Sequence, residues 1–380
     1  MSRVLLFTTM PWPFPAQLAG AFTACGARVE ALSPPHVKLA RSRHVARHYP
    51  WSLLAPRAGL TRALEMSQPD MVIPCDDMAA ELWLAHQGKM PLGRVEFLSR
   101  AKDVGAPVAD TLPLENDAAI DTAIAQLGLP LVIKCDATWG GDGVVIAHTR
   151  AEAHTAYAGF HNHARLRNLV RALRRKRAYF LSRALFPVRP VISAQRFVAG
   201  HPATSTLACW QGRIVAAHHF DVTQSAGATG PASVIARRDC PQMQAAAEGV
   251  ARAFNLSGLV GLDYVRDAAG RVHLLEMNER AVPTSHLALG DDPAFALLAA
   301  AGLPARPRAP ATAKEHVALF PREWLRDPLS HWLKDAFHDV PWDDPAVVRA
   351  CAQAADARAQ AALVAMDRRA LTPETALFRA

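Results

Sequence analysis

Residues 261–280 restrict the fold of this chain more than any other segment, because they place acidic residues inside apolar stretches. The segment reads GLDYVRDAAGRVHLLEMNER, with two apolar stretches separated by the polar turn Asp267–Gly270. This pattern predicts an antiparallel β-hairpin. Asp263 lies in the first predicted strand, and Glu276 and Asn278 lie at the end of the second. Side chains alternate along a strand, so Glu276 and Asn278 share a face, and cross-strand pairing can bring Asp263 to that face.

Asp263, Glu276 and Asn278 together offer carboxylate and amide oxygens, without thiolate or imidazole groups. Such a set of donors suits a hard cation such as Mg²⁺. The alternative is a surface hairpin with ordinary polar residues. Glu276 argues against that alternative because it stands inside the apolar stretch Leu274–Met277, where burial of an acid without a partner is costly. We therefore predict a metal site at this hairpin.

A second candidate site follows the apolar strand predicted at Leu131–Lys134. Lys134 ends this strand, and three glycines, Gly140, Gly141 and Gly143, follow it within a few residues. Glycine permits positive φ angles and a close approach of the backbone to phosphate. The pattern is not a Walker A loop, which has its lysine inside the loop and a serine or threonine beside it. Taken alone, the segment is better explained as a plain β-turn.

The first part of the chain alternates apolar stretches with helix-like stretches, which predicts a small parallel α/β domain. Strands are expected at 3–9, 28–32 and 71–74, and a helix at 15–25. The first turn, residues 8–13, contains no glycine, so the G-x-G-x-x-G cradle of dinucleotide-binding enzymes is absent. Asp76 and Asp77 follow the third strand, and an N-cap for the next helix explains them better than a contact with a substrate amine.

Composition excludes several classes of protein. Of the 380 residues, 51% are apolar and 20% are charged, which excludes general disorder. No stretch approaches the roughly 18 uninterrupted apolar residues of a membrane span. Prolines interrupt the N-terminal apolar run, so a signal peptide is not expected. The six cysteines lack Cys-x-x-Cys spacing, which is typical of buried thiols in a reducing compartment. We therefore expect a cytoplasmic globular protein.

The formal net charge of +8 comes from one segment. Residues 165–189 hold eight arginines and one lysine and no acidic residue, so the rest of the chain carries a net charge of −1. Apolar residues recur here at helical spacing, which predicts an amphipathic helix with an arginine face. Three interpretations stay open: a solvated face of a packed helix, recruitment of an anionic substrate or partner, and binding to nucleic acid or a membrane surface.

Together, the hairpin and the lysine–glycine segment resemble the ATP-grasp superfamily over roughly residues 93–300. The resemblance implies that Asp263, Glu276 and Asn278 bind Mg²⁺, with Glu276 bridging two ions and Mn²⁺ as an alternative metal. It also implies that Lys134 binds the phosphates of ATP. The loop 138–143, with Gly140, Gly141 and Gly143, matches the loop that covers those phosphates.

Further positions complete the implied nucleotide site. The segment Gln195, Arg196, Phe197 and Val198 resembles the hinge strand whose backbone binds adenine. The family's earlier nucleotide lysine falls near Arg94, which keeps the charge and loses the compact ammonium group.

The ending of the hairpin departs from the family pattern at one position. Glu279 replaces the proline of the usual Glu-x-Asn-Pro-Arg ending, and Arg280 is retained. Arg280 would lie beside the metals, where it suits an anionic substrate group or a developing acyl phosphate, so we expect it to be catalytic together with Lys134. Residues 284–286 would line the acceptor site. Pro202 stands near the place of a ribose-binding acid, which puts the ribose contacts in doubt.

The fold class implied by the resemblance is α/β and α+β. It comprises a small parallel α/β domain that precedes the grasp, an N-terminal ATP-grasp subdomain with the basic helical insertion, a C-terminal ATP-grasp subdomain, and a helical C-terminal extension. The expected limits of these four parts are 1–92, 93–190, 191–305 and 306–380.

The implied activity is that of an ADP-forming carboxylate–amine ligase. A substrate carboxylate attacks the γ-phosphate of ATP, and an amine then displaces phosphate from the acyl phosphate. One alternative keeps the fold with a thiol or another nucleophile, or stops at phosphoryl transfer. Another is a non-catalytic binder of nucleic acid or a partner through Arg165–Arg189, which would not need the three metal residues together. We expect small-molecule carboxylate and amine substrates, no nucleic acid and no membrane span. A homodimer stays open, since many relatives dimerise.

Overall fold

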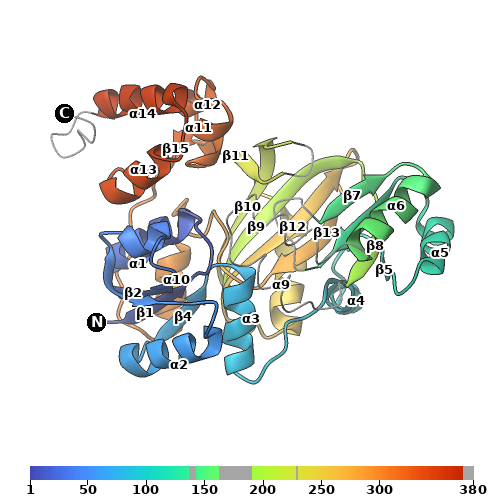
Figure 1. Ribbon diagram of the computed structural model, residues 1–380, viewed down its shortest axis with the longest axis horizontal. Coiled ribbons are helices and arrows are strands. Elements are labelled where there is room, and N and C mark those ends of the chain that lie inside the picture. Colours follow the sequence, from blue (N-terminus) through green and yellow to red (C-terminus); the bar gives the residue numbers. More distant parts are fainter. Residues whose placement is uncertain (137–142, 162–190, 228–229, 371–380) are drawn as a thin grey trace.

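Figure 1 shows the computed structural model, which describes residues 1–136, 143–161, 191–227 and 230–370. Three β-sheets organise these residues. The N-terminal sheet lies at one end of the molecule, the largest sheet lies in the middle, and the remaining sheet lies at the other end. The C-terminal helices lie beside the N-terminal domain, so the two ends of the chain share one side of the molecule.

The N-terminal sheet is parallel and has the strand order β3-β2-β1-β4. Its strands are β1 (Arg3–Phe7), β2 (Arg28–Ser33), β3 (Val45–Pro50) and β4 (Met71–Pro74), and its helices are α1 (Phe14–Ala24), η1 (Lys38–Arg41), α2 (Pro56–Ser67) and α3 (Asp77–His86). Val4–Phe7 is buried throughout because both faces of this parallel sheet are covered. The predicted parallel α/β arrangement is confirmed, including the helix after Asp76, and β3 and α2 are additions to it.

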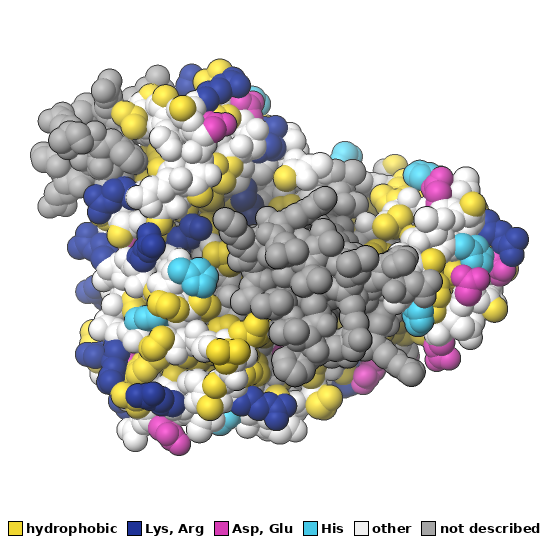
Figure 2. Space-filling view, viewed as in Figure 1, with side chains coloured by type: hydrophobic (Ala, Val, Ile, Leu, Met, Phe, Trp, Pro, Cys, Tyr) yellow, Lys and Arg dark blue, Asp and Glu magenta, His cyan; other side chains and the backbone are white. Residues whose placement is uncertain are grey.

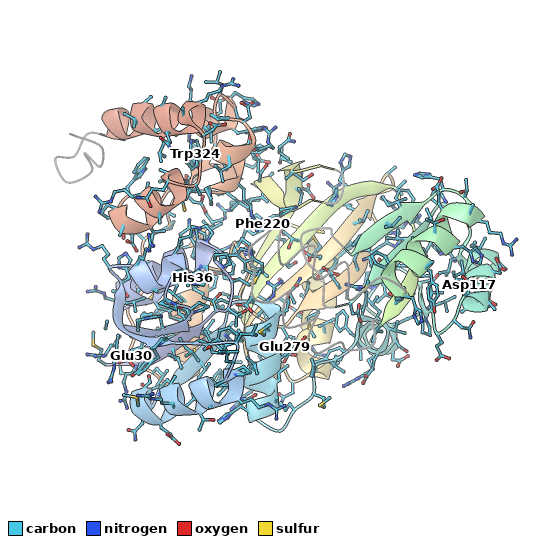
Figure 3. All side chains as sticks on the ribbon, in the orientation of Figure 1. Glu30, His36, Asp117, Phe220, Glu279 and Trp324 are labelled. Carbon is cyan, nitrogen blue, oxygen red and sulfur yellow. The ribbon has the colours of Figure 1, made fainter. Side chains whose placement is uncertain are left out.

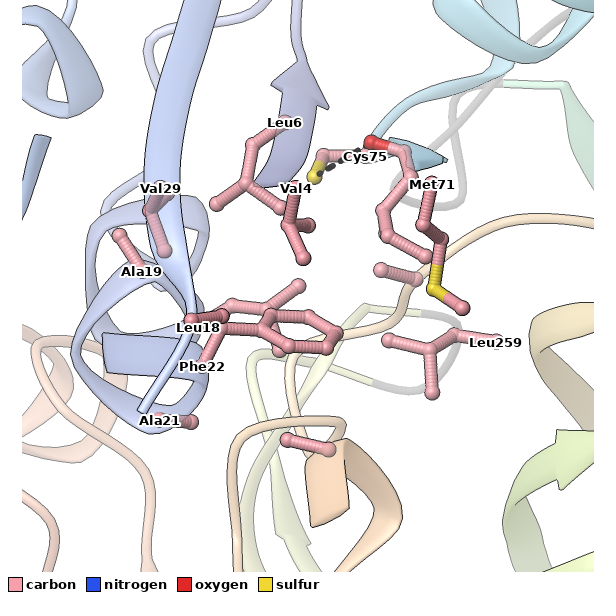
Figure 4. Close-up of a cluster of buried hydrophobic side chains, with 14 of the residues drawn as sticks. Val4, Leu6, Leu18, Ala19, Ala21, Phe22, Val29, Met71, Cys75 and Leu259 are labelled. Carbon is pink, nitrogen blue, oxygen red and sulfur yellow. Dashed lines mark hydrogen bonds between the residues drawn. The ribbon is translucent and has the colours of Figure 1, made fainter. Parts of the chain in front are cut away.

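One apolar core joins this domain to the largest sheet. Figure 4 shows side chains of β1, α1 and β4 gathered around Phe22 and Met71, with Leu259 of the largest sheet packed against them. Phe22 is fully buried and Leu259 is 4% exposed. Burying a side chain of this size contributes about 1.5–3 kcal/mol, so the contact holds the two parts in a fixed relation.

The sheet at the far end is antiparallel, with the order β5-β8-β6-β7. It consists of β5 (Thr111–Pro113), β6 (Leu131–Cys135), β7 (Val144–Ala147) and β8 (Ile192–Arg196), with α5 (Ala118–Leu127) and α6 (Arg150–His161) packed on it. The basic segment 165–189 lies outside the described residues. Figure 2 shows the Lys and Arg side chains of the described residues spread over several parts of the molecule.

The largest sheet has the order β13-β12-β9-β10-β11-β14-β15. Its strands are β9 (Gly200–Trp210), β10 (Arg213–Ser225), β11 (Ala232–Arg237), β12 (Gly258–Asp267), β13 (Val272–Asn278), β14 (His316–Ala318) and β15 (Phe337–His338). Helices α4 (Arg94–Asp103) and α9 (Pro241–Ala253) cover one face, whereas α10 (Pro293–Ala300) and α1 pack on the other. Residues 197–199 connect β8 to β9, so they link the two antiparallel sheets.

The C-terminal extension is helical, as expected, but not throughout. Its helices are α11 (Arg322–Arg326), α12 (Trp332–Asp335), α13 (Pro345–Ala352) and α14 (Ala357–Ala370). Residues 316–318 and 337–338 form β14 and β15, which extend the largest sheet. Strands this short carry no readable alternation. Figure 3 shows Trp324 inside this part, where its indole nitrogen donates to the carbonyl oxygen of Ala359.

Two further expectations concern the whole chain. All six cysteines are free, and five of them are buried, in agreement with the predicted buried thiols. None of the helices within the described residues is long and apolar enough to cross a membrane.

Candidate active site at the junction of two sheets

The hairpin of β12 and β13 brings the three predicted metal residues together. Asp263 stands directly opposite Glu276, and Asn278 Nδ2 donates to Asp263 Oδ2 over 3.0 Å. A β-bulge at Leu275 separates the pair Asp263–Glu276 from the next pair. Because of this bulge, Glu276 shares the face of Asp263, whereas Leu274, two residues earlier, packs under α9.

Lys134 reaches the same place from the other sheet. It lies near the end of β6, is 6% exposed, and its side chain makes no hydrogen bond or ion pair among the described residues. Burial, the largest cause, lowers the pKa of Lys134 to about 8; Arg94 acts in the same direction, and Glu276 and Asp263 oppose the change. Lys134 is therefore a buried cation that lacks a direct side-chain partner in the described part of the chain, and the charges of the hairpin acids act on it.

Arg94, at the start of α4, links the two sheets. Its Nη1 donates to Asp136 Oδ1 over 2.7 Å, and its Nη2 donates to Glu276 Oε2 over 2.8 Å. Sequence reasoning expected Arg94 at the phosphates of a nucleotide; the structure shows it holding a predicted metal ligand. Although burial opposes the change, Arg94 and then Lys134 lower the pKa of Glu276. Glu276 is thus ionised and fixed in orientation.

The residues of the hairpin fit a divalent cation. Burial raises the pKa of Asp263, and the charge of Glu276 raises it further. Two facing carboxyl groups with this repulsion gain stability when a cation lies between them. Within the described residues, no three His, Cys, Asp or Glu side chains form a metal cluster, so a third side-chain oxygen for a cation would come from the amide of Asn278. Two carboxylates and one amide match the preference of Mg²⁺.

The predicted hinge connects the two sheets at this junction. The Gln195 side chain is buried, with Nε2 donating to Thr111 Oγ1 over 2.9 Å and to the carbonyl oxygen of Leu275. Arg196 points outward and pairs with Asp110. Phe197 and Val198 follow the end of β8 and belong to no strand. The polar side chains of this segment are engaged within the protein, so an adenine contact here would come from the backbone.

The glycine loop lies largely outside the described residues, which exclude Gly140 and Gly141. Gly143 is described, and its carbonyl oxygen accepts from the backbone nitrogen of Cys135 over 2.9 Å. This bond closes the β6–β7 turn and brings the end of the loop next to the strand that carries Lys134.

Arg280 lies beside the hairpin, as expected, and has a partner that the sequence did not reveal. Its Nε donates to Asp77 Oδ1 over 2.6 Å, and its Nη2 donates to Asn278 Oδ1 over 3.0 Å. Its guanidinium carbon lies 5.6 Å from the centre of the Trp12 ring. Asp76 is the N-cap of α3, as predicted, through a bond from the backbone nitrogen of Ala79. The neighbouring Asp77 instead ties the N-terminal domain to Arg280.

Comparison with known proteins identifies the family. Residues 93–289, more than half of the chain, match the family described as carbamoyl-phosphate synthase L chain, ATP binding domain. The chain belongs to this family. Its members have the ATP-grasp fold of ATP- and Mg²⁺-dependent ligases, so the predicted superfamily, fold class and cofactors are confirmed. No curated protein sequence matches the chain.

Solved structures share the ATP-grasp fold over most of the chain. A biotin carboxylase from Campylobacter jejuni, solved in complex with β-γ-ATP, is 11% identical to this chain with a TM-score of 0.59. The match covers 81% of this chain and 72% of that chain. An N5-carboxyaminoimidazole synthetase from Staphylococcus aureus, complexed with ADP, is 12% identical with a TM-score of 0.56. The match covers 82% of this chain and 80% of that chain. An L-amino acid ligase from Bacillus licheniformis is 15% identical with a TM-score of 0.55, covering 79% and 75%.

The expected acceptor residues of this ATP-grasp chain divide into two groups. The hydroxyl groups of Thr284 and Thr206 bond to each other, and Ser285 Oγ accepts from the backbone nitrogen of Val282. Both are engaged within the fold. His286 instead contacts Asp339 of the C-terminal extension, with Nε2 3.0 Å from Oδ2. Sequence reasoning missed Asp339 because nothing near residue 339 signals a site.

A pocket of about 600 Å³ lies elsewhere, at the edge of β10. Its lining includes His218, His219, Arg237 and Glu315, and none of the predicted site residues. His219 bonds to Ser205 and Gln244 and so holds β10 against α9. The chemistry predicted from the sequence therefore belongs to the junction of the two sheets and not to this pocket.

Proposed function

We propose that this chain uses MgATP to activate a substrate carboxylate as an acyl phosphate and couples it to an amine. One observation carries the proposal: Lys134 of the smaller antiparallel sheet and the acids Asp263 and Glu276 of the largest sheet face one another at the junction of the two sheets. A cation without a direct partner and a pair of repelling carboxylates match the two halves of a metal–triphosphate complex.

Each side chain has a role in the proposal. Asp263, Glu276 and Asn278 hold Mg²⁺, which when bound neutralises charge on the β- and γ-phosphates. Lys134 donates to the phosphates, and the loop with Gly140, Gly141 and Gly143 covers them. Arg94 keeps Glu276 ionised and oriented, and contributes positive charge next to the phosphates.

The remaining chemistry depends on alignment. For phosphoryl transfer, the protein has to position the reacting groups and to neutralise their negative charge. Arg280, held by Asp77 and Asn278, presents its guanidinium group beside the hairpin. There it stabilises the negative charge of the substrate carboxylate and of the acyl phosphate. The amine then attacks the acyl carbon, phosphate leaves, and the nitrogen loses a proton.

The solved structures support the class of reaction. The Bacillus licheniformis protein is an L-amino acid ligase, and the Staphylococcus aureus synthetase was complexed with ADP. Because their sequence identity to this chain is low, these structures support the fold but do not identify the substrates. Experiment has to identify the acid and the amine that this chain uses.

The test is release of ADP from ATP and Mg²⁺ in the presence of pools of small carboxylates and amines. Wild-type protein should release ADP with at least one pool, and Glu276→Ala and Lys134→Ala should each lower the rate by about three orders of magnitude. Glu279→Gln is the matched control, because Glu279 follows the same strand and interacts with Lys89. Undiminished ADP release by the Glu276→Ala, Lys134→Ala double variant would contradict the assignment. Absence of both nucleotide binding and turnover would favour the non-catalytic binder.

A further inference from the structure

Three distant parts of the chain meet at Asp339, in the turn after β15. Gln17 of α1 donates through Nε2 to the carbonyl oxygen of Asp339 over 2.8 Å. His286, which follows the metal hairpin, contacts the carboxylate of Asp339, and the backbone nitrogen of Phe320 donates to it. We refer to Gln17, His286, Arg322, His338 and Asp339 as the Asp339 cluster.

Several buried polar atoms of the Asp339 cluster have no hydrogen-bond partner among the described residues. They are Oε1 of Gln17, Nδ1 of His286, and both ring nitrogens of His338. A buried polar atom without a hydrogen bond costs about 1–3 kcal/mol. Such atoms are rare in folded proteins, and each asks for an explanation. Here all four belong to residues that bond to Asp339 or precede it in the chain.

Arg322 supplies an incompletely satisfied cation at the same place. It is the first residue of α11, and its Nη1 donates to the carbonyl oxygen of Ala232 over 3.0 Å. Within the described part of the chain, no carboxylate lies at ion-pair distance from it. A guanidinium group has five N–H donors, so most of its capacity is unused. Burial lowers the pKa of Arg322 to about 10, with Asp339 opposing this change and Arg280 adding to it.

A purely structural role does not account for Arg322. Its bond to Ala232 helps to hold α11 against β11, and α11 and β11 also pack through other residues. A neutral donor would satisfy one carbonyl oxygen equally well. The Arg322 side chain is partly buried, and a guanidinium group in such a place often has a carboxylate beside it, as Arg280 has Asp77. Arg322 is therefore suited to an anion that arrives from outside.

The position of Arg322 relates this anion to the substrate. Arg280 follows β13, whereas Arg322 is anchored to β11, and three strands lie between β13 and β11. At ~4.8 Å between neighbouring strands, β13 and β11 are roughly 19 Å apart across the sheet. Arg280 thus serves the reacting carboxylate beside the metal residues, and Arg322 lies on the far side of it.

We propose that Arg322 and the Asp339 cluster bind a second anionic group, carboxylate or phosphate, of a substrate whose first carboxylate is activated at the hairpin. The inference rests on the proposed function and narrows the substrate to acids that carry at least two negative groups. The guanidinium donors of Arg322 bind the anion.

The experiment measures binding of two probes, succinate and inorganic phosphate, by calorimetry on the full chain saturated with Mg²⁺ and a non-hydrolysable ATP analogue. Wild type should bind at least one probe, and the tighter probe identifies the anionic group as carboxylate or phosphate. Arg322→Met should weaken binding at least tenfold, and Arg322→Lys should restore part of it, because lysine keeps the charge and loses the planar fork. Arg349→Met, which removes an exposed arginine of the same extension, is the control.

Two results would overturn the inference: binding by Arg322→Met within about twofold of wild type, or no binding of either probe to wild type. Arg322→Gln is the second variant, and nucleotide affinity measured in the same titrations shows that each variant is folded. The experiments distinguish a failure of the proposed ligase function from a failure of the anion site. If no carboxylate pool releases ADP while probe binding depends on Arg322, the anion site stands and the ligase does not. If pools turn over and the KM of acids with two negative groups is unchanged in Arg322→Met, the ligase stands and the anion site does not.

Discussion

The β12–β13 hairpin and the Asp339 cluster are both polar and buried, but the protein prepares them in opposite ways. At the hairpin, Asp263 bonds to Asn278, Glu276 bonds to Arg94, and Asn278 also accepts from Arg280. In the Asp339 cluster, four buried nitrogen and oxygen atoms lack partners, and Arg322 has one. The hairpin is complete before any ligand arrives, whereas the Asp339 cluster is incomplete.

This difference separates the ATP chemistry that the whole family shares from the selection of a particular acid by this chain. Charges that act on ATP must be aligned in advance, because reorganising them during phosphoryl transfer would add to the barrier. A site that selects one acid is built from groups whose partners the ligand itself supplies, and a ligand without them leaves those groups unpaired. The family resemblance accordingly ends near residue 289, before Arg322 and Asp339.

The largest expected effect concerns the β12–β13 hairpin, whose polar groups already have partners within the protein. Arg280→Met should lower the free energy of unfolding by about 1.5–3 kcal/mol, because it leaves Asp77 without its partner in a partly buried ion pair. Chemical denaturation measures the loss. Asp77→Asn in the Arg280→Met background should recover part of the stability, and the double-mutant cycle isolates the coupling. Purely additive effects would show that the pair is not coupled.

Arg94→Lys tests whether the paired bonds of the Arg94 guanidinium group to Asp136 and Glu276 are needed for nucleotide binding. A lysine keeps the charge but cannot donate to both Asp136 and Glu276, which Arg94 reaches through separate nitrogens. We expect the KM for MgATP to rise about tenfold, with a smaller effect on stability. The measurement is the dependence of ADP release on MgATP concentration. Arg100→Lys, on the exposed side of the same helix, should leave this KM unchanged, and an equal rise in both variants would argue against the fork.

The stability of the C-terminal extension should depend on pH through His338. Burial lowers the pKa of His338 to about 4 from an unfolded value of 6.5, while Asp339 and Glu323 oppose the change. The folded state therefore binds this proton less readily than the unfolded state. The contribution to stability is complete above pH 6.5 and is lost as the pH falls from 6.5 towards 4. Melting temperatures at pH 7 and pH 5 should differ less in His338→Leu than in wild type, and an identical difference would refute the prediction.

The smallest effect concerns the stability of Arg322→Met. Replacing a partly buried cation that has no carboxylate at ion-pair distance among the described residues with an apolar side chain of similar length should leave the free energy of unfolding unchanged or raise it by up to about 1 kcal/mol. Thermal denaturation without ligand measures this change, and saturating succinate or phosphate should stabilise wild type more than the variant. A loss as large as that of Arg280→Met would mean that the two arginines are equivalent, and the comparison would fail.

The sequence was informative where the residues of a site lie close together in the chain. Alternation placed Glu276 and Asn278 on one face and the polar turn showed that pairing could bring Asp263 to that face, and the apolar strand before Lys134 located this lysine. The bulge at Leu275 was not visible, since a single extra residue leaves no mark on composition. Arg94 was expected at the nucleotide, but its bond to Glu276 depends on how two sheets approach each other.

The Asp339 cluster was beyond sequence reasoning for a different reason. Gln17, His286 and Asp339 are individually ordinary residues, separated by most of the length of the chain. Their meeting depends on β14 and β15, which are too short to show a pattern. Only tertiary structure turns such residues into a site.

The contacts between the two ends of the chain also set the order in which the protein can be completed. Gln17 and Asp339 are 322 positions apart, and Ser42 and Asp344, whose side chains bond to each other, are 302 apart. Closing loops of this length is slow compared with local folding. A growing chain can fold its N-terminal sheet early, but α1 and η1 wait for their last partners until the end of synthesis. During translation, the nucleotide half of the site can form before the half that would select the acid.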